Sequence, residues 1–393
     1  MTDLFLRKGA DHRLRGGHLW VYSNEVDSAR SPLSSFASGD LVTVRNTNGT
    51  LLGSAYMDPS TLICARVYAP FEECVMDVAF FTARLAAARA MRQQCFDKPF
   101  YRLVYGDSDM LPGLIIDCFG EVLVMQINNS GLERHREPLL LALISTLKPS
   151  GILLRGDSRS RREQGLPGDS EVVYGVVPTL VPLEENGVQF LAPVYDGQKT
   201  GWFYDHRMSR ARLASWVKGK TVLDVYSYIG GWGVQAASFG ASSVTCLDSS
   251  AQALEGAAAN AQLNQLEDRV TTRRGSAPEL MAAMQTEGAL FDVVILDPPA
   301  FIQRKKDLKK GIAAYRRINE LGLQLLHPGG LLVSASCSMH LSRADLIAAL
   351  QQAAVRAGCQ IRVCEQGAQG PDHPIHPAIP ETEYLKAVFV RRL

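Results

Sequence analysis

Two side chains able to take part in covalent catalysis follow two separate apolar runs of the sequence. Asp297 follows the run Phe291–Leu296 and opens the segment Asp-Pro-Pro-Ala-Phe, and Cys337 follows the run Leu331–Ser336. Each run has the length and composition of a buried β-strand. The prolines after Asp297 end its strand and stiffen the turn, which would hold the carboxylate at the strand end. A thiolate is a strong nucleophile and a carboxyl group can move a proton, so the pair would suit covalent catalysis.

Both residues also have a purely structural interpretation. Asp297 could simply end a strand, and a lone cysteine after a strand is most often a buried structural thiol. The other cysteines form no Cys-x-x-Cys pair and no Cys/His cluster with zinc spacing, so we expect free thiols and no metal site. The position of Cys337 beside Asp297 favours a nucleophile.

A third segment has the features of a ligand-binding turn. The run Thr221–Val225 leads into Tyr-Ser-Tyr-Ile-Gly-Gly-Trp-Gly, where Gly230 and Gly231 would let the backbone approach a ligand closely. Asp248, 24 residues after Asp224, ends the next predicted strand, as expected for an acid that binds ribose hydroxyls. The glycines do not spell Gly-x-Gly-x-x-Gly, which disfavours a dinucleotide. S-adenosylmethionine carries no phosphate, so it does not need that glycine pattern, and Asp224 could bind its amino-acid end. The alternative is a tight turn that binds no ligand.

The elements that must position these residues divide into three predicted domains. Residues 1–74 show short β-favouring runs and turns, typical of a small β-barrel-like module, and residues 75–190 suggest an α+β middle domain. In residues 191–393 apolar strands alternate with helices, which predicts an α/β doubly wound sheet. The expected strands of that last domain are Thr221–Val225, Val244–Leu247, Phe291–Leu296, Leu331–Ser336 and Tyr384–Val390, with helices at Ser250–Asn264 and Arg343–Ala357.

Composition limits the class of protein. The chain has 393 residues, 46% of them hydrophobic and 21% charged, which is typical of a globular protein and not of a disordered one. No apolar run approaches the ~20 residues that span a bilayer. The first eight residues lack the features of a signal peptide. We therefore expect a cytoplasmic protein without a membrane partner.

The formal net charge of +1 says nothing for nucleic acid, but basic residues cluster locally. One cluster is Arg155, Arg159, Arg161 and Arg162. A second begins just after the Asp-Pro-Pro turn and could hold RNA phosphates, although a solvated helix face explains it equally well. Its members are Arg304, Lys305, Lys306, Lys309, Lys310, Arg316 and Arg317, against the single acid Asp307.

These segments, in this order, resemble the ribosomal RNA large subunit methyltransferase I family, which methylates carbon-5 of a cytosine. The resemblance covers nearly the whole chain. It implies a Rossmann-like class I methyltransferase domain after a PUA domain and an α+β middle domain, S-adenosylmethionine as cofactor, and large-subunit (23S) ribosomal RNA as partner. The matching segments are Arg7–Val26 for the PUA domain, Tyr105-Gly-Asp and Leu111–Gly120 for the middle domain, Gly197–Arg207 before the first cofactor strand, and Asp372-His-Pro and Tyr384-Leu-Lys near the C-terminus.

The resemblance also implies roles for single residues. Cys337 would be the nucleophile and Asp297 its partner acid. Four positions depart from the family pattern: Asp224 and Tyr226 stand where relatives often have Asn and Phe, Ser276 stands where an acid often contacts the adenine amino group, and Ala300 replaces a common Lys. The implied cofactor-binding residues are Phe203, Arg207, Asp224, Tyr226, Ser227, Gly230, Gly231, Asp248, Ser276 and Asp297.

The implied reaction needs an unstacked cytosine. A thiolate that adds to carbon-6 makes carbon-5 nucleophilic, and an acid at the N3 edge stabilises the developing charge. Partial desolvation would raise the pKa of Asp297, which suits an acid. Phe301 could stack on the extruded base, with Arg304, Lys305, Lys306, Lys309 and Lys310 on flanking phosphates. The base that removes the carbon-5 proton is not identified; His373 is one candidate and a turn residue is another.

Two other functions stay open. An amino-group methyltransferase acting on adenine or guanine of RNA would use Asp-Pro-Pro followed at once by an aromatic residue and would need no thiol. A non-catalytic RNA-binding assembly factor could keep the cofactor pocket, although the pair of Asp297 and Cys337 argues against it. The target cytosine and the oligomeric state, a homodimer included, are not determined by the sequence.

Overall fold

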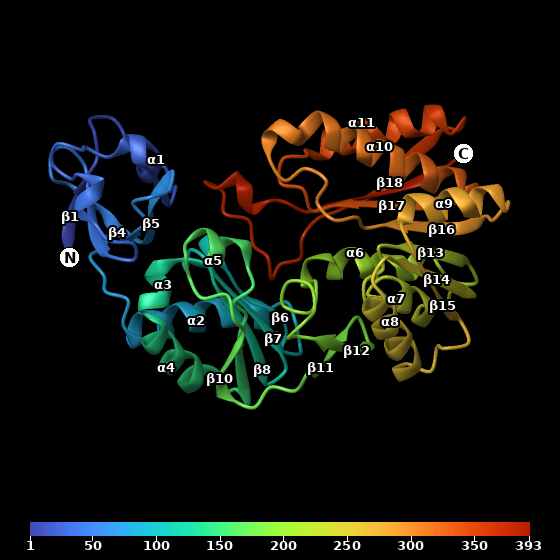
Figure 1. The fold of residues 1–393 in the computed structure, drawn as a ribbon, viewed down its shortest axis with the longest axis horizontal. Helices are drawn as coiled ribbons and strands as arrows, with labels where there is room; N and C mark the ends of the chain where they lie inside the picture. Colours follow the sequence, from blue (N-terminus) through green and yellow to red (C-terminus); the bar gives the residue numbers. More distant parts are fainter. The chain divides into compact units, whose positions relative to one another are not determined.

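The computed structural model describes residues 1–393 and divides them into two compact units (Figure 1). The chain passes from one unit to the other five times, so neither unit is a single continuous segment. Unit 1 contains Met1–Val181, Pro193–Trp202 and Pro371–Thr382, and unit 2 contains Pro182–Ala192, Phe203–Gly370 and Glu383–Leu393.

The first part of unit 1 is a five-stranded sheet in the order β1-β3-β4-β5-β2. β1 runs parallel to β3, and the other pairs are antiparallel. Apolar side chains such as Leu4, Val44 and Val67 are buried in its own core. The elements are β1 (Thr2–Phe5), α1 (His12–Arg15), β2 (Trp20–Tyr22), β3 (Leu41–Arg45), β4 (Leu51–Met57) and β5 (Ile63–Pro70).

The second part of unit 1 is another five-stranded sheet, in the order β10-β9-β8-β7-β6, on which helices α2 and α4 pack together. Asp77 caps α2, because its side chain accepts a hydrogen bond of 2.8 Å from the backbone N–H of Phe80. The elements are α2 (Val78–Gln93), β6 (Phe100–Tyr105), β7 (Leu114–Phe119), β8 (Val122–Ile127), α3 (Ser130–Arg134), α4 (Arg136–Leu147), β9 (Gly151–Leu154), α5 (Arg159–Glu163) and β10 (Glu171–Gly175).

Unit 2 is built on a seven-stranded sheet in the order β15-β14-β13-β16-β17-β19-β18. Neighbouring strands from β15 to β17 are parallel, and β19 is antiparallel to both of its neighbours. The central strands are buried on both faces, as expected of parallel strands covered by helices. The strands are β13 (Thr221–Val225), β14 (Ser243–Asp248), β15 (Val270–Arg274), β16 (Phe291–Leu296), β17 (Leu326–Ser336), β18 (Ile361–Gly367) and β19 (Lys386–Arg392), and a separate two-stranded sheet contains β11 (Leu180–Glu185) and β12 (Val188–Pro193).

Helices cover both faces of this sheet: α9, α10 and α11 lie on one side in Figure 1, and α6, α7 and α8 lie on the other. In α10, Gly311, Tyr315, Ile318 and Gly322 recur at helical spacing and are buried. A Cβ on Gly322 would come within 3.0 Å of side chains of β16 and β17, so this glycine allows close packing. The helices are α6 (Arg207–Ala211), α7 (Gly233–Ser238), α8 (Ala251–Leu263), α9 (Ala277–Thr286), α10 (Leu308–Gln324) and α11 (Arg343–Arg356).

The predicted fold class is confirmed: a mixed α/β chain whose second unit carries a Rossmann-like sheet. Two strands, Thr221–Val225 and Phe291–Leu296, have the predicted bounds. Two edge strands, β15 and β18, were missed because their side chains are mostly exposed and no apolar run marks them. No helix of the structure combines the length and apolar character that crossing a membrane requires.

Candidate active site

The candidate site lies where the strand order of the unit 2 sheet reverses. β13 and β16 are neighbours, but the chain continues from β13 to β14 on one side and from β16 to β17 on the other. Such a switch point leaves a crevice at the carboxyl ends of the strands, where doubly wound folds bind ligands. Asp224 lies near the end of β13, and Asp297 directly follows β16, so both carboxyl groups belong to this edge.

The turn after β13 has an unusual backbone. Tyr226 and Tyr228 have positive φ angles of 65° and 49°, and Gly230 has a φ of 82°. Such angles cost energy for residues with a side chain, and strained turns of this kind cluster at ligand sites. The turn is held by Leu247 O, which accepts from the backbone N–H groups of Tyr226 and Ser227. It leads into α7, where the Gly233 N–H donates to Asp224 Oδ2 over 2.8 Å.

Asp248 lies at the end of β14, as predicted. Its Oδ2 accepts from the backbone N–H of Tyr228 over 3.0 Å, and its Oδ1 accepts from that of Ser250 over 2.9 Å. These bonds fix the carboxylate, and each oxygen keeps a lone pair for a further donor such as a ribose hydroxyl.

The buried polar atoms of this turn fit a cationic ligand. Asp224 is fully buried, its Oδ1 has no hydrogen-bond partner, and the Ser227 hydroxyl beside the turn also lacks one. Buried polar atoms are normally paired, so these two point to a missing partner. Burial raises the pKa of Asp224 to about 8, more than the Gly233 N–H lowers it. S-adenosylmethionine carries two positive charges, on its sulfonium and ammonium groups, and the carboxyl group of Asp224 could interact favourably with either of them.

The other predicted cofactor residues have mixed surroundings. The Phe203 ring meets the Tyr228 ring edge-on at 5.6 Å, which brings the segment before β13 to the turn. Ser276 is exposed at the start of α9, just after β15. Arg207 is buried, with Nε 3.6 Å from Glu185 Oε2 and its guanidinium 5.3 Å from the Tyr204 ring centre. The two glycines of the turn, Gly230 and Gly231, are buried.

Asp297 belongs to a cluster that sequence analysis did not foresee. The Trp232 indole N–H donates to Asp297 Oδ2 over 3.0 Å, and His206 Nε2 lies 3.3 Å from Asp297 Oδ1. His206 is 3% exposed, and its Nδ1 has no hydrogen-bond partner. Its ring also lies 5.3 Å from the Trp232 ring. The carboxylate of Asp297 is thus held from two sides while about a fifth of its side chain stays exposed.

This cluster decides the charge of Asp297. Burial acts to raise the pKa of Asp297, but the contacts with His206 and Trp232 outweigh burial, and the pKa lies below its ordinary range. The expectation of a raised pKa is therefore wrong, because the sequence shows the desolvated strand end but not the two groups that stabilise the anion.

Cys337 lies between two anchored serines. Ser336 and Ser338 are fully buried, and both hydroxyls hydrogen-bond the Tyr315 hydroxyl of α10, over 2.8 and 2.9 Å. Cys337 itself stays partly exposed. The Ser338 hydroxyl also accepts from the backbone N–H of Ile302 over 3.3 Å. This bond links the segment after β17 to the segment after β16, so the segments that carry Cys337 and Asp297 are held together.

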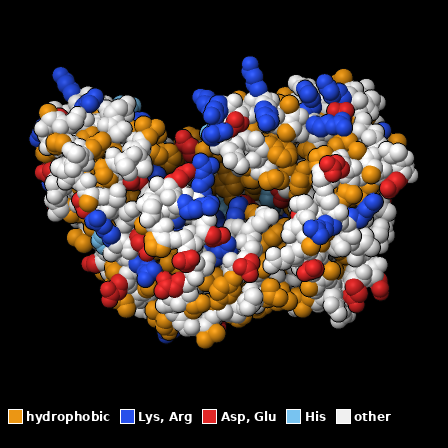
Figure 2. Space-filling model, in the orientation of Figure 1, with side chains coloured by type: hydrophobic (Ala, Val, Ile, Leu, Met, Phe, Trp, Pro, Cys, Tyr) orange, Lys and Arg blue, Asp and Glu red, His pale blue; other side chains and the backbone are white.

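The second basic cluster is exposed around the start of α10. Lys305, Lys306, Lys309 and Lys310 are exposed and form no ion pair in the structure, whereas Arg304 pairs with Asp307 over 3.0 Å. Figure 2 shows Lys and Arg side chains gathered over the region of α10 and α11 on the face in view. Phe301, just before the cluster, packs against the Tyr315 ring, with the ring centres 4.8 Å apart and the planes tilted by 54°.

The first basic cluster is largely structural. Arg155 and Arg161 are 2% exposed. Arg155 donates to Asp157 and to the carbonyl oxygen of Val194, and Arg161 donates to Glu133. His373 is also explained by packing: it is buried in unit 1, with Nδ1 3.0 Å from Asp372 Oδ1.

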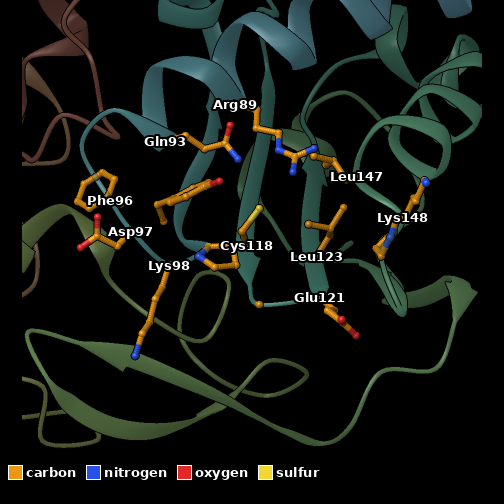
Figure 3. A pocket seen from close by; sticks show the side chains of 14 residues that line it. Arg89, Gln93, Phe96, Asp97, Lys98, Cys118, Glu121, Leu123, Leu147 and Lys148 are labelled. Atoms are coloured by element: carbon orange, nitrogen blue, oxygen red, sulfur yellow. The ribbon is translucent and has the colours of Figure 1, made fainter.

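Unit 1 also contains cavities. One of about 490 Å³ lies in the second sheet region, with Arg89 and Gln93 from α2 on one side, Cys118 and Leu123 from the strands, and Lys98 at the rim (Figure 3). Another of about 590 Å³ is lined by residues of the first sheet, such as Trp20 and Arg66, and by residues from loops and α5 of the second part, such as Asn128 and Glu163. Neither includes a residue that the sequence predicted for catalysis, so we do not count them in the active site. The described residues hold no group of three or more His, Cys, Asp or Glu suited to a metal ion.

Comparisons with known proteins identify the family of this chain. A family model of PUA-like domains matches residues 4–70, and one of S-adenosylmethionine-dependent methyltransferases matches residues 170–391, more than half of the chain. Ribosomal RNA large subunit methyltransferase I of Shewanella denitrificans is 36% identical over 392 residues, 98% of each chain. The enzyme of that name from Yersinia pestis strain Antiqua is 36% identical over 394 residues, 99% of this chain and 98% of that one.

Solved structures show the same fold. The candidate methyltransferase SMU.776, crystallised with SAH, superposes with a TM-score of 0.84 at 20% identity over 100% of both chains. A candidate SAM-dependent methyltransferase from Streptococcus mutans gives 0.83 over 100% of both chains. The predicted cofactor, S-adenosylmethionine, and the predicted PUA domain are confirmed by the family models. The chain therefore is an S-adenosylmethionine-dependent methyltransferase that belongs to the ribosomal RNA large subunit methyltransferase I family.

Proposed function

We propose that this enzyme methylates carbon-5 of a cytosine in large-subunit ribosomal RNA through a covalent adduct with Cys337. The substrate class follows the names of its relatives. The observation that carries the chemistry is the junction of two neighbouring strand ends, where the hydrogen bond from Ile302 to Ser338 holds the segments of Asp297 and Cys337 together.

Cys337 supplies the nucleophile. Its thiol loses a proton to solvent, and the thiolate adds to carbon-6 of cytosine, which makes carbon-5 enamine-like. After methylation a base removes the carbon-5 proton, the carbon–sulfur bond breaks, and the electron pair returns to sulfur. The hydroxyls of Ser336 and Ser338 hydrogen-bond the Tyr315 hydroxyl, which fixes the backbone on both sides of Cys337.

Asp297 faces the N3 edge of the base in this proposal. The carboxylate is anionic in the free enzyme, and it takes up a proton from solvent when cytosine binds. Without that proton, a lone pair of the carboxylate oxygen would face the lone pair of N3. His206 Nε2, 3.3 Å from Asp297 Oδ1, stabilises the carboxylate until that proton arrives. An acid that becomes protonated on binding stabilises the charge that develops on the ring.

S-adenosylmethionine supplies an activated methyl group when it is bound. Asp248 would hold the ribose hydroxyls, while Asp224, Ser227 and the turn after β13 would hold the amino-acid end. Phe203, Arg207 and Ser276 stay predictions for the same site. The predicted domain bounds, at residues 74 and 190, are also part of the proposal.

RNA must present the cytosine outside a stack. Phe301 would stack on it, and Lys305, Lys306, Lys309 and Lys310 would hold phosphates. Lysines in the first turn of a helix oppose its dipole, and α10 has no acid in that turn. An anion at this end relieves the conflict, which favours phosphate binding over a solvated face.

The experiment uses RNA with 5-fluorocytosine at the target. Fluorine cannot leave carbon-5 as a cation, so the reaction should stop after methylation, with the enzyme bound to its RNA. We expect a denaturant-stable adduct that requires S-adenosylmethionine and maps to Cys337. Asp297→Asn should bind RNA but react slowly.

A second cysteine provides the control. Cys359 is as accessible as Cys337 but precedes β18, at the other edge of the sheet. Cys359→Ala should keep the adduct and the activity, and Cys337→Ala should lose both while it still binds S-adenosylmethionine. Methylation by Cys337→Ala at the wild-type rate would refute the adduct, and amino-group methylation of adenine or guanine would replace it. If the protein methylates no RNA at all, the remaining hypothesis is a non-catalytic RNA-binding assembly factor.

A further inference from the structure

Lys386 is a buried lysine that the mechanism above does not use. It is the first residue of β19 and is 6% exposed. Lysines are almost never buried unless their charge is paired. Lys386 forms no ion pair with any carboxylate in the structure, so its ammonium group needs a counter-charge from elsewhere.

The position of Lys386 identifies that counter-charge. In the sheet register it lies opposite Ser336, the residue before Cys337. Its Nζ donates to the carbonyl oxygen of Ser338, the residue after Cys337, over 2.7 Å. The ammonium group is therefore bound to the same three-residue segment that carries the thiol.

The charges around Lys386 agree with this pairing. Burial lowers the pKa of Lys386 to about 8; Cys337 acts in the opposite direction, Arg343 lowers the pKa further, and Glu383 raises it. Glu383 is exposed, so its effect is screened by water. Among the neighbouring charges, an ionised Cys337 therefore has the largest stabilising effect on the ammonium group of Lys386.

We propose that Lys386 is a positioning residue that keeps Cys337 as a thiolate, ready to add to the base. The proposal rests on the proposed role of Cys337. The thiol proton goes to solvent, and the ammonium group keeps all its protons. When the carbon–sulfur bond breaks, the electron pair returns to sulfur beside the same ammonium group, so Lys386 also favours release of the product.

The first experiment measures the reactivity of the thiol without RNA. Wild-type protein and Lys386→Met are treated with iodoacetamide between pH 6 and 10, and alkylation is counted on the peptide that contains Cys337. The thiolate is the reactive form. We expect the midpoint of the pH profile to rise by about one to two pH units in Lys386→Met, the effect of losing an opposite charge nearby.

Two variants serve as controls. Lys386→Arg keeps the positive charge and should keep most of the wild-type profile. Lys218→Met removes an exposed lysine that precedes β13, at the amino edge of the sheet, and should change nothing. Calorimetry with S-adenosylmethionine checks that each variant is folded. An unchanged midpoint in a folded Lys386→Met would overturn the proposal.

A second measurement leaves Lys386 in place. Proteins labelled with ¹³C at the lysine ε-carbon are titrated by NMR, and the Lys386 signal is assigned with Lys386→Arg. Because coupling between two groups is reciprocal, Cys337→Ala should lower the midpoint of Lys386 by a similar amount. Equal midpoints in wild type and Cys337→Ala would also overturn the proposal, even if Lys386→Met does not fold.

Both measurements are independent of methylation. If the 5-fluorocytosine adduct forms on Cys337 but neither midpoint moves, the adduct mechanism stands and the role of Lys386 fails. If the midpoints move but no adduct forms, the pair exists and the proposed function fails.

Discussion

Asp224 should make the stability of this protein fall as the pH rises. Its side chain is fully buried, and burial raises the pKa to about 8, from the ordinary value of 3.8. The native state therefore keeps a proton that the unfolded chain releases. The contribution of this group is fully present below about pH 4, is lost progressively as the pH rises, and changes no further above about pH 8.

The variant Asp224→Asn isolates this effect. Asparagine resembles the protonated acid, does not titrate, and can still accept the hydrogen bond from the Gly233 N–H. One pH unit corresponds to about 1.4 kcal/mol, so the variant should gain about 2.7 kcal/mol of unfolding free energy relative to wild type between pH 5 and pH 7. The gain should level off near pH 8.

Urea denaturation at pH 5, 6, 7 and 8, followed by tryptophan fluorescence, measures this difference. Asp292→Asn is the matched control, because Asp292 lies at the other end of β16 and its pKa is lowered. Asp292 is ionised in both states over this range, so its difference curve should be flat. A flat curve for Asp224→Asn as well would show that the native carboxyl group is already ionised over this range, which would refute the raised pKa of Asp224.

Two further predictions concern ligand binding. Asp248→Ala should weaken S-adenosylmethionine binding by about 1.5–3 kcal/mol, the loss of hydrogen bonds to a charged group, and calorimetry should find Asp268→Ala unchanged. Unaltered affinity in a folded Asp248→Ala would remove this residue from the site. Replacing Lys305, Lys306, Lys309 and Lys310 by Gln should lower the slope of RNA affinity against salt by about 0.7 for each lost phosphate contact. Lys218→Gln should leave the slope as it is, and an equal slope in the fourfold variant would return these lysines to a solvated helix face.

The sequence was informative where a buried strand ends in a conspicuous turn. The sequence correctly placed Asp297 and Asp248 at strand ends. A central parallel strand is buried on both faces, so it appears in the sequence as a continuous apolar run whose end is easy to see. β15 and β18 carry no such pattern, since an edge strand exposes much of its surface.

The partners of the predicted residues could not be read in the same way. Trp232 and His206 are relevant to the site because they contact Asp297. These contacts lower the pKa of Asp297, whereas the sequence predicted a raised pKa. Lys386 looks like an ordinary strand residue until the register places it opposite Ser336. Arg155 and Arg161 stood out in the sequence as part of a basic cluster, yet tertiary contacts bury both.

The repeated passage of the chain between the units has a consequence for how the protein folds during synthesis. Residues Pro371–Thr382 belong to unit 1, although almost two hundred residues separate them from its N-terminal part. Buried Arg92 donates to the carbonyl oxygen of Asp372 over 2.9 Å, and the Arg102 backbone N–H donates to its Oδ2 over 3.1 Å. Translation proceeds at about 5 to 20 residues per second, so unit 1 cannot form these contacts until translation is nearly finished. Truncation before residue 371 should thus remove one acceptor of buried Arg92, which would keep its ion pair with Asp109, and the acceptor of the Arg102 backbone N–H. A fragment of unit 1 should therefore be more stable when this distant segment is supplied as well.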